Sequence, residues 1–208
     1  MTLRIDEINQ PFSADTFINT YFRPMRISEE RREKREDAAH SFNDTLLFLF
    51  ALISAYQNYG VDWEVIEYQF RVEFEQAALR YSRNTPYLQA YIDEKTSDFI
   101  DTTREQDLTD PYWLSDERAA MEAVNDANDV VGYEELQDAI DNGYRYKKWV
   151  TENDSRVRKS HRKMEGKTIP ITECFELDKG QMLYAHDWVN CPDECYNCRC
   201  ANVYLKEK

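Results

Sequence analysis

The stretch Leu46-Leu-Phe-Leu-Phe-Ala-Leu-Ile-Ser-Ala-Tyr56 is uncharged, and a short distance upstream Ser28-Glu-Glu-Arg-Arg-Glu-Lys-Arg-Glu-Asp37 alternates acid and base at helical spacing. A serine followed by acidic residues is typical of a helix start, so one helix is predicted to run from Ser28 until Gly60 ends it. The apolar part is shorter than the roughly 20 residues that span a bilayer. We therefore expect a buried core helix and no membrane contact.

Further helices are predicted on the C-terminal side of this one, because apolar residues recur there with a period of 3.6. Only five glycines and six prolines interrupt the 208 residues, and 42% of the residues are hydrophobic, enough for a real core. The predicted helices are Asp62–Tyr81, Tyr87–Ile100, one opening at Ser115 and running through Val124, and a shorter one at Tyr133–Ile140 ended by Asn142-Gly143.

The last 60 or so residues have a different character. Gly166–Leu177 is rich in β-branched residues and contains Pro170, which predicts short edge strands. Asp178–Gly180 reads as a turn, and Arg199–Leu205 as a terminal strand. The expected fold class is therefore α+β, mostly α, with a helical N-terminal region followed by a small helix-plus-antiparallel-sheet domain. The acidic stretch 101–111 loses apolar periodicity, so we expect the domains 1–111 and 112–208.

Charge is distributed unevenly along the chain. The net charge is −14, which disfavours general binding to nucleic acid phosphates. Residues 144–167, however, contain nine Lys or Arg against three Asp or Glu, a local charge of +6 that leaves −20 for the rest. This basic segment could dock on an acidic protein surface or contact DNA by one face, or it could be a solvated helix end.

Four of the five cysteines lie within the last 18 residues, as Cys191, Cys195, Cys198 and Cys200. Met1–Gln10 has no secretory signal pattern, so the protein is expected in a cytoplasm, where clustered thiols are more often metal ligands, catalytic groups or buried residues than disulfides. Cys195-x2-Cys198 has the spacing of a zinc knuckle, and His161 and His186 are the available imidazoles. One structural zinc is a candidate here, with buried or simply free thiols as the alternative.

A second cluster contains Asp154, Arg156, Arg158 and His161. If one helix held Asp154 and His161, they would lie on similar faces, which permits acid/base chemistry or metal-assisted hydrolysis. The alternative is structural, with Asp154 as a helix N-cap and His161 in a local network. The sequence has no nucleophile elbow, phosphate loop or HExxH motif to favour an enzyme.

Several spaced segments together resemble a known family. They are Trp149-Val-Thr-Glu-Asn-Asp-Ser-Arg-Val-Arg-Lys-Ser-His161, Glu165-Gly-Lys-Thr-Ile-Pro-Ile171, Phe175, Met182-Leu-Tyr184, Asp187 and Asn197-Cys-Arg-Cys200, preceded by Trp113-Leu-Ser-Asp-Glu-Arg-Ala-Ala120, Ala123-x-Asn125-x-Ala127-Asn128, Tyr133 and Gly143. In this order they resemble the phage Mu F-like domain, the C-terminal module of minor head (head morphogenesis) proteins of tailed bacteriophages. The resemblance covers roughly 112–205.

The resemblance implies a virion protein present in few copies inside the head near the portal vertex, acting in head morphogenesis and in DNA packaging or ejection. It also implies that residues 1–111 form an arm that contacts the portal protein, the major capsid protein or the scaffold. The protein would be in the host cytoplasm during assembly and then in the virion. Direct DNA contact would fall to the basic segment 144–167.

Position by position, the resemblance assigns the family's characteristic residues to Trp149, Asp154, Arg156, Arg158, His161, Gly166, Phe175, Asn197, Cys198, Arg199 and Cys200. It implies no catalytic residue. Cys191 and Cys195 lie outside the pattern, and Ala185-His186 stands where the family commonly has proline. A metal site should thus rest first on His161, Cys198 and Cys200, with Cys191, Cys195 or His186 as additions. Two alternatives to a head protein remain, a metal-dependent hydrolase using Asp154, His161 and the cysteines, and a zinc-stabilised nucleic-acid binder.

Overall fold

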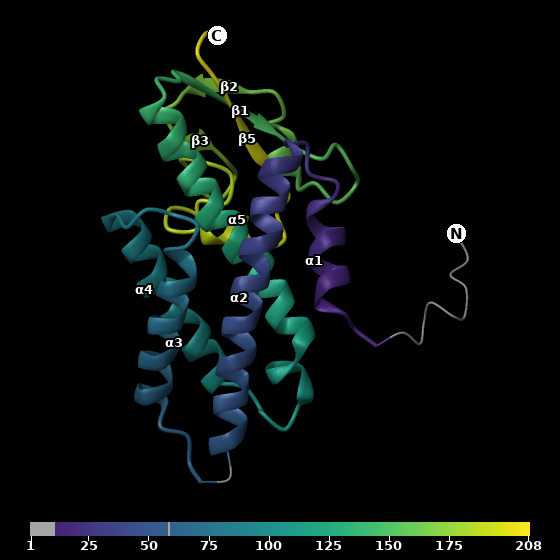
Figure 1. The fold of residues 1–208 in the computed structure, drawn as a ribbon. Helices are drawn as coiled ribbons and strands as arrows, with labels where there is room; N and C mark the ends of the chain where they lie inside the picture. The colour runs from purple at the N-terminus through teal and green to yellow at the C-terminus, as the bar shows by residue number, and fades with distance from the viewer. Residues whose placement is uncertain (1–10, 58) are drawn as a thin grey trace, which may run out of the picture.

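A long antiparallel helix pair forms the centre of the molecule (Figure 1). The computed structural model describes residues 11–57 and 59–208, so the predicted absence of a signal at Met1–Gln10 concerns residues outside the described part. The main helices are α1 (Ala14–Phe22), α2 (Glu29–Tyr56), α3 (Trp63–Ala78), α4 (Pro86–Arg104) and α5 (Asp116–Asp141). Helix α2 packs most extensively on α5 and also on α3, α3 packs on α4, and α1 contacts both α2 and α5.

Hydrogen-bonding side chains set the helix starts. The residue before each of these helices accepts a hydrogen bond from the backbone N–H three residues on, which satisfies one of the free donors of the first turn. These N-cap residues are Ser13, Ser28, Asp62, Thr85 and Ser115. The starts predicted at Ser28 and Ser115 are therefore confirmed.

Helix α5 differs from its prediction, because it is one helix of 26 residues and not two. The separate helix predicted at Tyr133–Ile140 is wrong: Gly132 lies inside α5, and a Cβ there would stand 3.3 Å from the Tyr184 ring. This glycine permits close packing and does not break the helix. The helix ends, as expected, at Asn142 and at Gly143, whose φ is +72°.

The C-terminal part of the chain forms small antiparallel sheets beside one end of the α2–α5 pair (Figure 1). One sheet has the order β2-β1-β5, and β3 pairs with β4. The strands are β1 (Tyr146–Val150), β2 (Thr168–Pro170), β3 (Phe175–Glu176), β4 (Gln181–Met182) and β5 (Ala201–Leu205), with the short helices η2 (Pro111–Leu114), α6 (Lys159–Arg162) and η3 (Pro192–Glu194). Pro170 lies on an edge strand, and the predicted α+β fold is confirmed.

The basic segment 144–167 contains the central strand of that sheet. β1 pairs with both neighbours, for example Lys148 with Thr168 and Trp149 with Asn202. The alternative that this segment is a solvated helix end is therefore wrong, because its first third is sheet and Lys147 and Trp149 are fully buried. The alternation of Lys147 and Trp149 with Tyr146 and Lys148 is a strand period.

The apolar stretch of α2 lies in the core as predicted, with Leu46, Leu49, Phe50 and Ile53 all buried. An 18-residue window of this helix has a mean hydropathy of 1.3, with 44% of it buried, and α2 is the one helix in the described residues long and apolar enough to cross a membrane. Length and composition alone are weak evidence for a membrane span, since core helices meet the same criteria.

Apolar side chains from both predicted domains join one buried core. The stretch 101–111, predicted as the boundary, begins with the last turn of α4 and ends at η2. The packing of α2 on α5 joins the predicted domain 1–111 to the predicted domain 112–208. The division at 111 and 112 stays a prediction.

A buried ion pair ties α2 to α5. The Glu135 carboxylate accepts hydrogen bonds from Arg31 at 2.8 and 2.5 Å and from Arg35 at 2.6 and 2.8 Å. Burial opposes the charge of Glu135, but the two guanidinium groups outweigh it and lower the pKa from 4.5 to about 2. Stability from this group is therefore complete above about pH 4.5 and is lost as the pH falls toward 2.

We expect Glu135→Gln to lower the free energy of unfolding by about 3 kcal/mol at pH 7, because it leaves two partly buried guanidinium groups without their counter-charge. Urea unfolding from pH 7 to pH 2 measures the effect, and the difference from the wild type should shrink as the wild-type carboxylate is protonated. The exposed Glu117→Gln in the same helix is the control, with a change within about 0.5 kcal/mol. A constant difference across this pH range would contradict the ion-pair account.

Candidate metal centre

The candidate site is built around the loop 197–200, which lies against the buried face of α5. The Asn125 side-chain oxygen accepts a hydrogen bond from the Asn197 backbone N–H at 2.8 Å. The Asn128 amide donates to the Cys198 carbonyl at 3.4 Å, and the Tyr21 hydroxyl of α1 donates to the same carbonyl at 2.8 Å. Three helix-borne groups thus fix the backbone that carries the cysteines.

The loop 183–190, which precedes the cysteine loop in sequence, is held by Asp129 of α5. Asp129 accepts a hydrogen bond from the Tyr184 hydroxyl at 2.6 Å and from the Trp188 backbone N–H at 2.9 Å. Burial raises the pKa of Asp129 well above its ordinary value. Asp187 of this loop accepts from the Tyr87 hydroxyl of α4 and from the Leu183 N–H at 2.6 Å. The loop is therefore fixed by polar groups that the helices bury.

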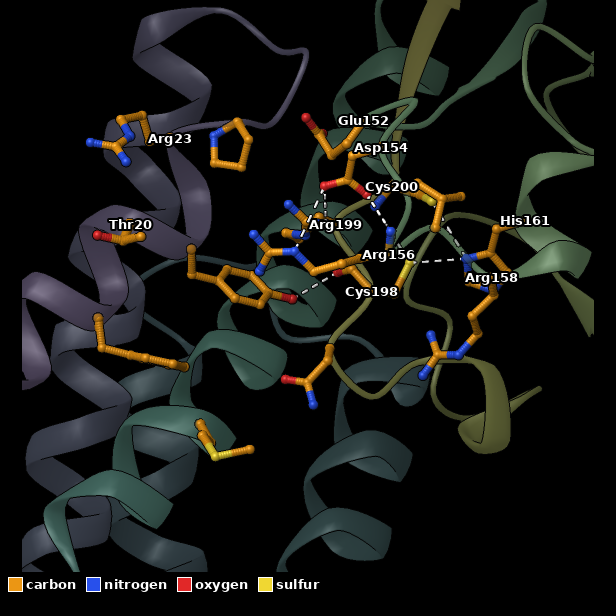
Figure 2. Close-up of a pocket in the computed structure, with 16 residues that line it drawn as sticks. Thr20, Arg23, Glu152, Asp154, Arg156, Arg158, His161, Cys198, Arg199 and Cys200 are labelled. Atoms are coloured by element: carbon orange, nitrogen blue, oxygen red, sulfur yellow. Dashed lines mark hydrogen bonds and ion pairs between the residues drawn. The ribbon is translucent and has the colours of Figure 1, made fainter. Parts of the chain in front are cut away.

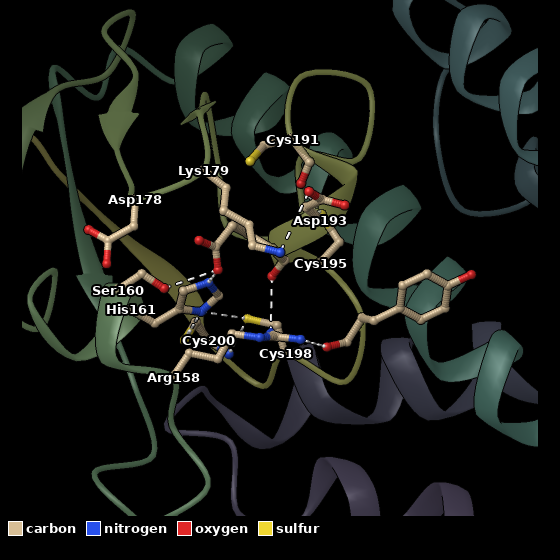
Figure 3. Close-up of polar contacts among 12 residues, drawn as sticks. Arg158, Ser160, His161, Asp178, Lys179, Cys191, Asp193, Cys195, Cys198 and Cys200 are labelled. Atoms are coloured by element: carbon tan, nitrogen blue, oxygen red, sulfur yellow. Dashed lines mark hydrogen bonds and ion pairs between the residues drawn. The ribbon is translucent and has the colours of Figure 1, made fainter.

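His161 of α6 points at two thiols (Figures 2 and 3). Its Nδ1 lies 3.3 Å from the Cys198 Sγ and 3.4 Å from the Cys200 Sγ, and all three ligand atoms lie within 4.8 Å of one another. The three residues are buried. The Trp149 ring of β1 contacts the His161 imidazole edge to face, with ring centroids 5.4 Å apart. Trp149 packs in turn on Phe175, with centroids 5.1 Å apart, and these contacts confine the imidazole.

A carboxylate holds the other side of the same imidazole. His161 Nε2 lies 3.1 Å from the Glu194 Oε2, which also accepts a hydrogen bond from the Ser160 hydroxyl at 3.0 Å. Glu194 ends the short helix η3 and is buried. A carboxylate at Nε2 favours the tautomer with its proton on that nitrogen, which leaves the Nδ1 lone pair directed at the thiols.

The pKa values of the two thiols are shifted in opposite directions. Burial opposes ionisation of Cys198, but its interactions with the side chains of Cys200, His186 and His161 outweigh burial and lower the pKa of Cys198. The neighbouring Cys198 and burial raise the pKa of Cys200. The Cys200 backbone N–H also donates to the Cys198 Sγ at 3.4 Å. Cys198 is therefore the thiol that ionises first.

Asp154 is not in this group. Its carboxylate forms an ion pair with Arg199 at 2.7 Å and accepts the Arg156 backbone N–H at 2.9 Å. The proposal that Asp154 is a helix N-cap is wrong, because α6 begins after Arg158 and the segment around Asp154 is a loop. For the same reason Asp154 and His161 do not share a helix face. The expectation that His161 lies in a local network is confirmed.

Other residues assigned by the resemblance support the loops around the cluster. Arg158 donates to the carbonyls of Glu194 and Tyr196, Gly166 and Asn197 have φ values of +73° and +53°, and Phe175 packs on Trp149. A positive φ explains glycine and asparagine at these two positions. These residues hold the site in shape and contribute no ligand atom.

The additional candidate ligands lie elsewhere. Within residues 11–57 and 59–208, Cys191, Cys195 and His186 lie outside the group of mutually close ligand atoms formed by His161, Cys198 and Cys200. The Cys195 thiol donates to the Cys191 carbonyl at 3.4 Å, and His186 Nε2 contacts the Cys198 carbonyl. Short sequence spacing brought these residues into the prediction, but the chain turns through η3 between Cys191 and Cys195, and neither thiol joins the ligand group.

Sequence reasoning missed Glu194, Ser160 and the role of Asn125 and Asn128. The signal for Glu194 was its position beside a cysteine in an acidic pair, but such acids are usually solvated. Asn125 and Asn128 were noted only as part of the resemblance. Their three-residue spacing on a helix whose alanines are buried could have marked them as buried groups with distant partners.

A cavity of about 640 Å³ adjoins the cluster, with His161, Cys198 and Cys200 in its wall. Its other lining side chains come mainly from α1 and the residues just after it, from the loop after β1 and from the loop 197–200, and Figure 2 shows how they surround the space. The charged ones are Arg23, Glu152, Asp154, Arg156, Arg158 and Arg199. The cluster is thus buried but lies beside a cavity whose wall includes these charged side chains.

Two kinds of chemistry suit this geometry. Two thiols and one imidazole nitrogen are a typical set of zinc ligands. Alternatively, the order Cys198, His161, Glu194 is that of a nucleophile, a base and a carboxylate that orients the base. The second thiol at an equal distance from the same nitrogen favours the metal arrangement, because a nucleophile needs only one.

We expect Asn128→Ala to lower the free energy of unfolding by about 2 kcal/mol, because it removes a buried amide that bonds the Cys198 carbonyl and the Arg35 side chain. Urea unfolding measures the loss, and amide hydrogen exchange should speed up at residues 197–200 first. The exposed Asn84→Ala is the control and should change stability by less than about 0.5 kcal/mol. Equal effects of the two changes would show that Asn128 does not hold the loop.

The family comparison covers both the long helix and the site. The family model described as Phage Mu protein F like protein matches residues 94–203, more than half of the chain, from within α4 into β5. Neither the curated proteins nor the solved structures include a significant match. The family consists of phage structural proteins, which ties the chain to the phage head and the virion. As its motifs predicted, the chain belongs to the phage Mu protein F-like family.

Proposed function

We propose that this chain is a minor head protein of a tailed phage or prophage, placed in few copies inside the head near the portal vertex. It would act in head morphogenesis and in DNA packaging or ejection, assembling in the host cytoplasm and remaining in the virion. The observation that carries the proposal is the family match over α5 and the whole region around His161. Its partner would be the portal protein, with the major capsid protein or scaffold as the other candidates.

Helices α2 and α3, which precede the region matched by the family model, offer a contact surface. Helices α2 and α3 and their connection expose large apolar side chains, which elsewhere in the chain are mostly buried. These are Phe48, Tyr56, Tyr59, Val65, Tyr68 and Leu79. Tyr68 is 64% exposed and Phe48 is 45% exposed. This distribution supports the proposal that the N-terminal helices are the arm that meets another head component.

A structural role fits the polar residues better than a hydrolytic one. Asp154 is bound to Arg199, and it stands outside the group of potential metal ligands, so the hydrolase alternative loses its proposed acid or base. Arg158 is bonded to two backbone carbonyls. These charged groups connect loops to one another, which is what a domain without catalytic function requires.

DNA contact through the basic segment has less support than contact with protein. The Lys147 amine is buried and donates to the Ile171 carbonyl at 2.7 Å, and burial lowers its pKa to about 8. Lys163 pairs with Asp178 at 2.8 Å, and the Arg158 guanidinium donates to the carbonyls of Glu194 and Tyr196. Several of the nine positive charges are thus occupied within the protein, which reduces the charge left for phosphates.

Purified virions provide the test of this proposal. Quantitative mass spectrometry should find the chain in far fewer copies than the major capsid protein and close to the copy number of the portal protein. Protease added to intact virions should leave it uncut, and crosslinks should join α2 or α3 to a head protein. Absence from virions, or a copy number equal to that of the capsid protein, would refute the proposal.

The contact surface has its own test within the same phage. Tyr68→Glu and Phe48→Glu are expected to reduce incorporation into virions at least tenfold, since each places a charge in the proposed apolar interface, while circular dichroism shows the fold unchanged. Glu173→Ala, an exposed change in the C-terminal region, is the matched control and should incorporate normally. If both arm variants incorporate like the control, the partner binds another face.

A further inference from the structure

The distances between the His161 Nδ1 and the two cysteine Sγ atoms are close to those between ligand atoms on one zinc ion. Zinc binds sulfur at about 2.3 Å and nitrogen at about 2.0–2.1 Å, so a nitrogen and a sulfur on one tetrahedral ion stand roughly 3.5 Å apart. The Nδ1 of His161 lies 3.3 Å from one Sγ and 3.4 Å from the other. We propose that His161 Nδ1, Cys198 Sγ and Cys200 Sγ bind one zinc ion, with the fourth position open to the adjoining cavity.

The contact on the far side of the imidazole supports this assignment. A histidine that binds metal through one nitrogen almost always donates its other N–H to a carboxylate, a carbonyl or water. Glu194 Oε2 lies 3.1 Å from His161 Nε2 and is itself held by Ser160. Glu194 therefore orients the ligand and cannot share its ion, because the two ring nitrogens point in opposite directions. It is a positioning residue.

The donor chemistry selects zinc among the common divalent ions. Thiolates and imidazole are soft or borderline ligands, which suit zinc far better than magnesium or calcium. The residues are buried, with Cys198 and Cys200 only 3% and 4% exposed, and the Cys200 N–H donates to the Cys198 sulfur. Such a backbone hydrogen bond stabilises negative charge on sulfur, as metal ligation requires.

The fourth ligand comes from outside this set of side chains. Among the described residues, no further His, Cys, Asp or Glu places a ligand atom within 4.8 Å of all three. The nearby Asp154 carboxylate is bound to Arg199. Because the three ligands line the cavity of about 640 Å³, a water molecule or a small anion can reach the ion from there. Three protein ligands with one exchangeable position distinguish this site from a closed structural site of four.

Two cysteines of the same loop provide matched controls. Cys191 and Cys195 are as buried as the proposed ligands, and Figure 3 shows both apart from the His161 imidazole. Both lie outside the ligand group. A change to serine at either position removes a thiol of equal burial without removing a ligand, so the two pairs of cysteines separate ligation from general effects on folding.

Zinc content of the purified full-length protein is the first measurement. We expect one zinc per chain in the wild type, in Cys191→Ser and in Cys195→Ser, and less than a tenth of that in Cys198→Ser, Cys200→Ser and His161→Ala. Glu194→Gln should keep the fold and weaken zinc binding about 10- to 100-fold in a competition titration with a chelator. Zinc-free wild type, or equal loss in the Cys191 and Cys195 variants, would overturn the proposal.

Cobalt replacement tests the open position, and it reads the ion directly even if a ligand variant folds poorly. The cobalt-loaded wild type should show thiolate charge-transfer bands and tetrahedral d–d bands, and added azide should shift the d–d bands. Bands that azide leaves unchanged would overturn the open fourth position. Rapid alkylation of Cys198 alone in zinc-supplemented protein would instead favour the nucleophile arrangement with His161 and Glu194 and overturn the metal site.

Discussion

The burial of polar side chains along one face of α5 is the constraint on which the C-terminal region depends. Asn125, Asp126, Asn128 and Asp129 are all buried, and a buried polar group without a partner costs about 1–3 kcal/mol. Their partners are supplied by Tyr91 and Lys95 of α4 and by loops distant in sequence. Helix α5 can therefore be buried on this face only when the loops 183–190 and 197–200 are in place. The helical region and the C-terminal loops are coupled through hydrogen bonds as well as through apolar packing.

This coupling determines where the cysteines lie. The loop 197–200 is fixed from one side by α1 and α5 through the Cys198 carbonyl, and from the other by the Arg199 to Asp154 ion pair. With the backbone held at both ends, the two thiols both lie against the Nδ1 of His161. Trp149 and Glu194 fix that ring from its face and from its far nitrogen. A metal ion at this point would connect α6 to the loop 197–200, and it would reinforce contacts that the protein already makes.

The sequence was sufficient for the elements with local signals. Capped helix starts, the buried stretch of α2 and the edge position of Pro170 all follow from nearby residues, and the spaced motifs around Trp149 and Asn197 predicted the family. The sequence did not reveal that α5 continues through Gly132, because the reason is the distant Tyr184 ring. Cys191 and Cys195 were grouped with the ligands because their spacing along the chain does not show where each thiol points once the chain has turned at η3. The sequence did not distinguish Glu194 from the other acidic residues, because tertiary packing decides whether a single carboxylate is buried.

X-ray absorption at the zinc edge of the zinc-loaded full-length protein tests the central claim most directly, because it counts the atoms bound to the ion. The proposed zinc site predicts two sulfur atoms at about 2.3 Å, with nitrogen and one further light atom at about 2.0–2.1 Å. Three or four sulfur atoms would require Cys191 or Cys195 to reach the ion, and a shell without sulfur would place zinc elsewhere. Either result would contradict a site formed by His161, Cys198 and Cys200.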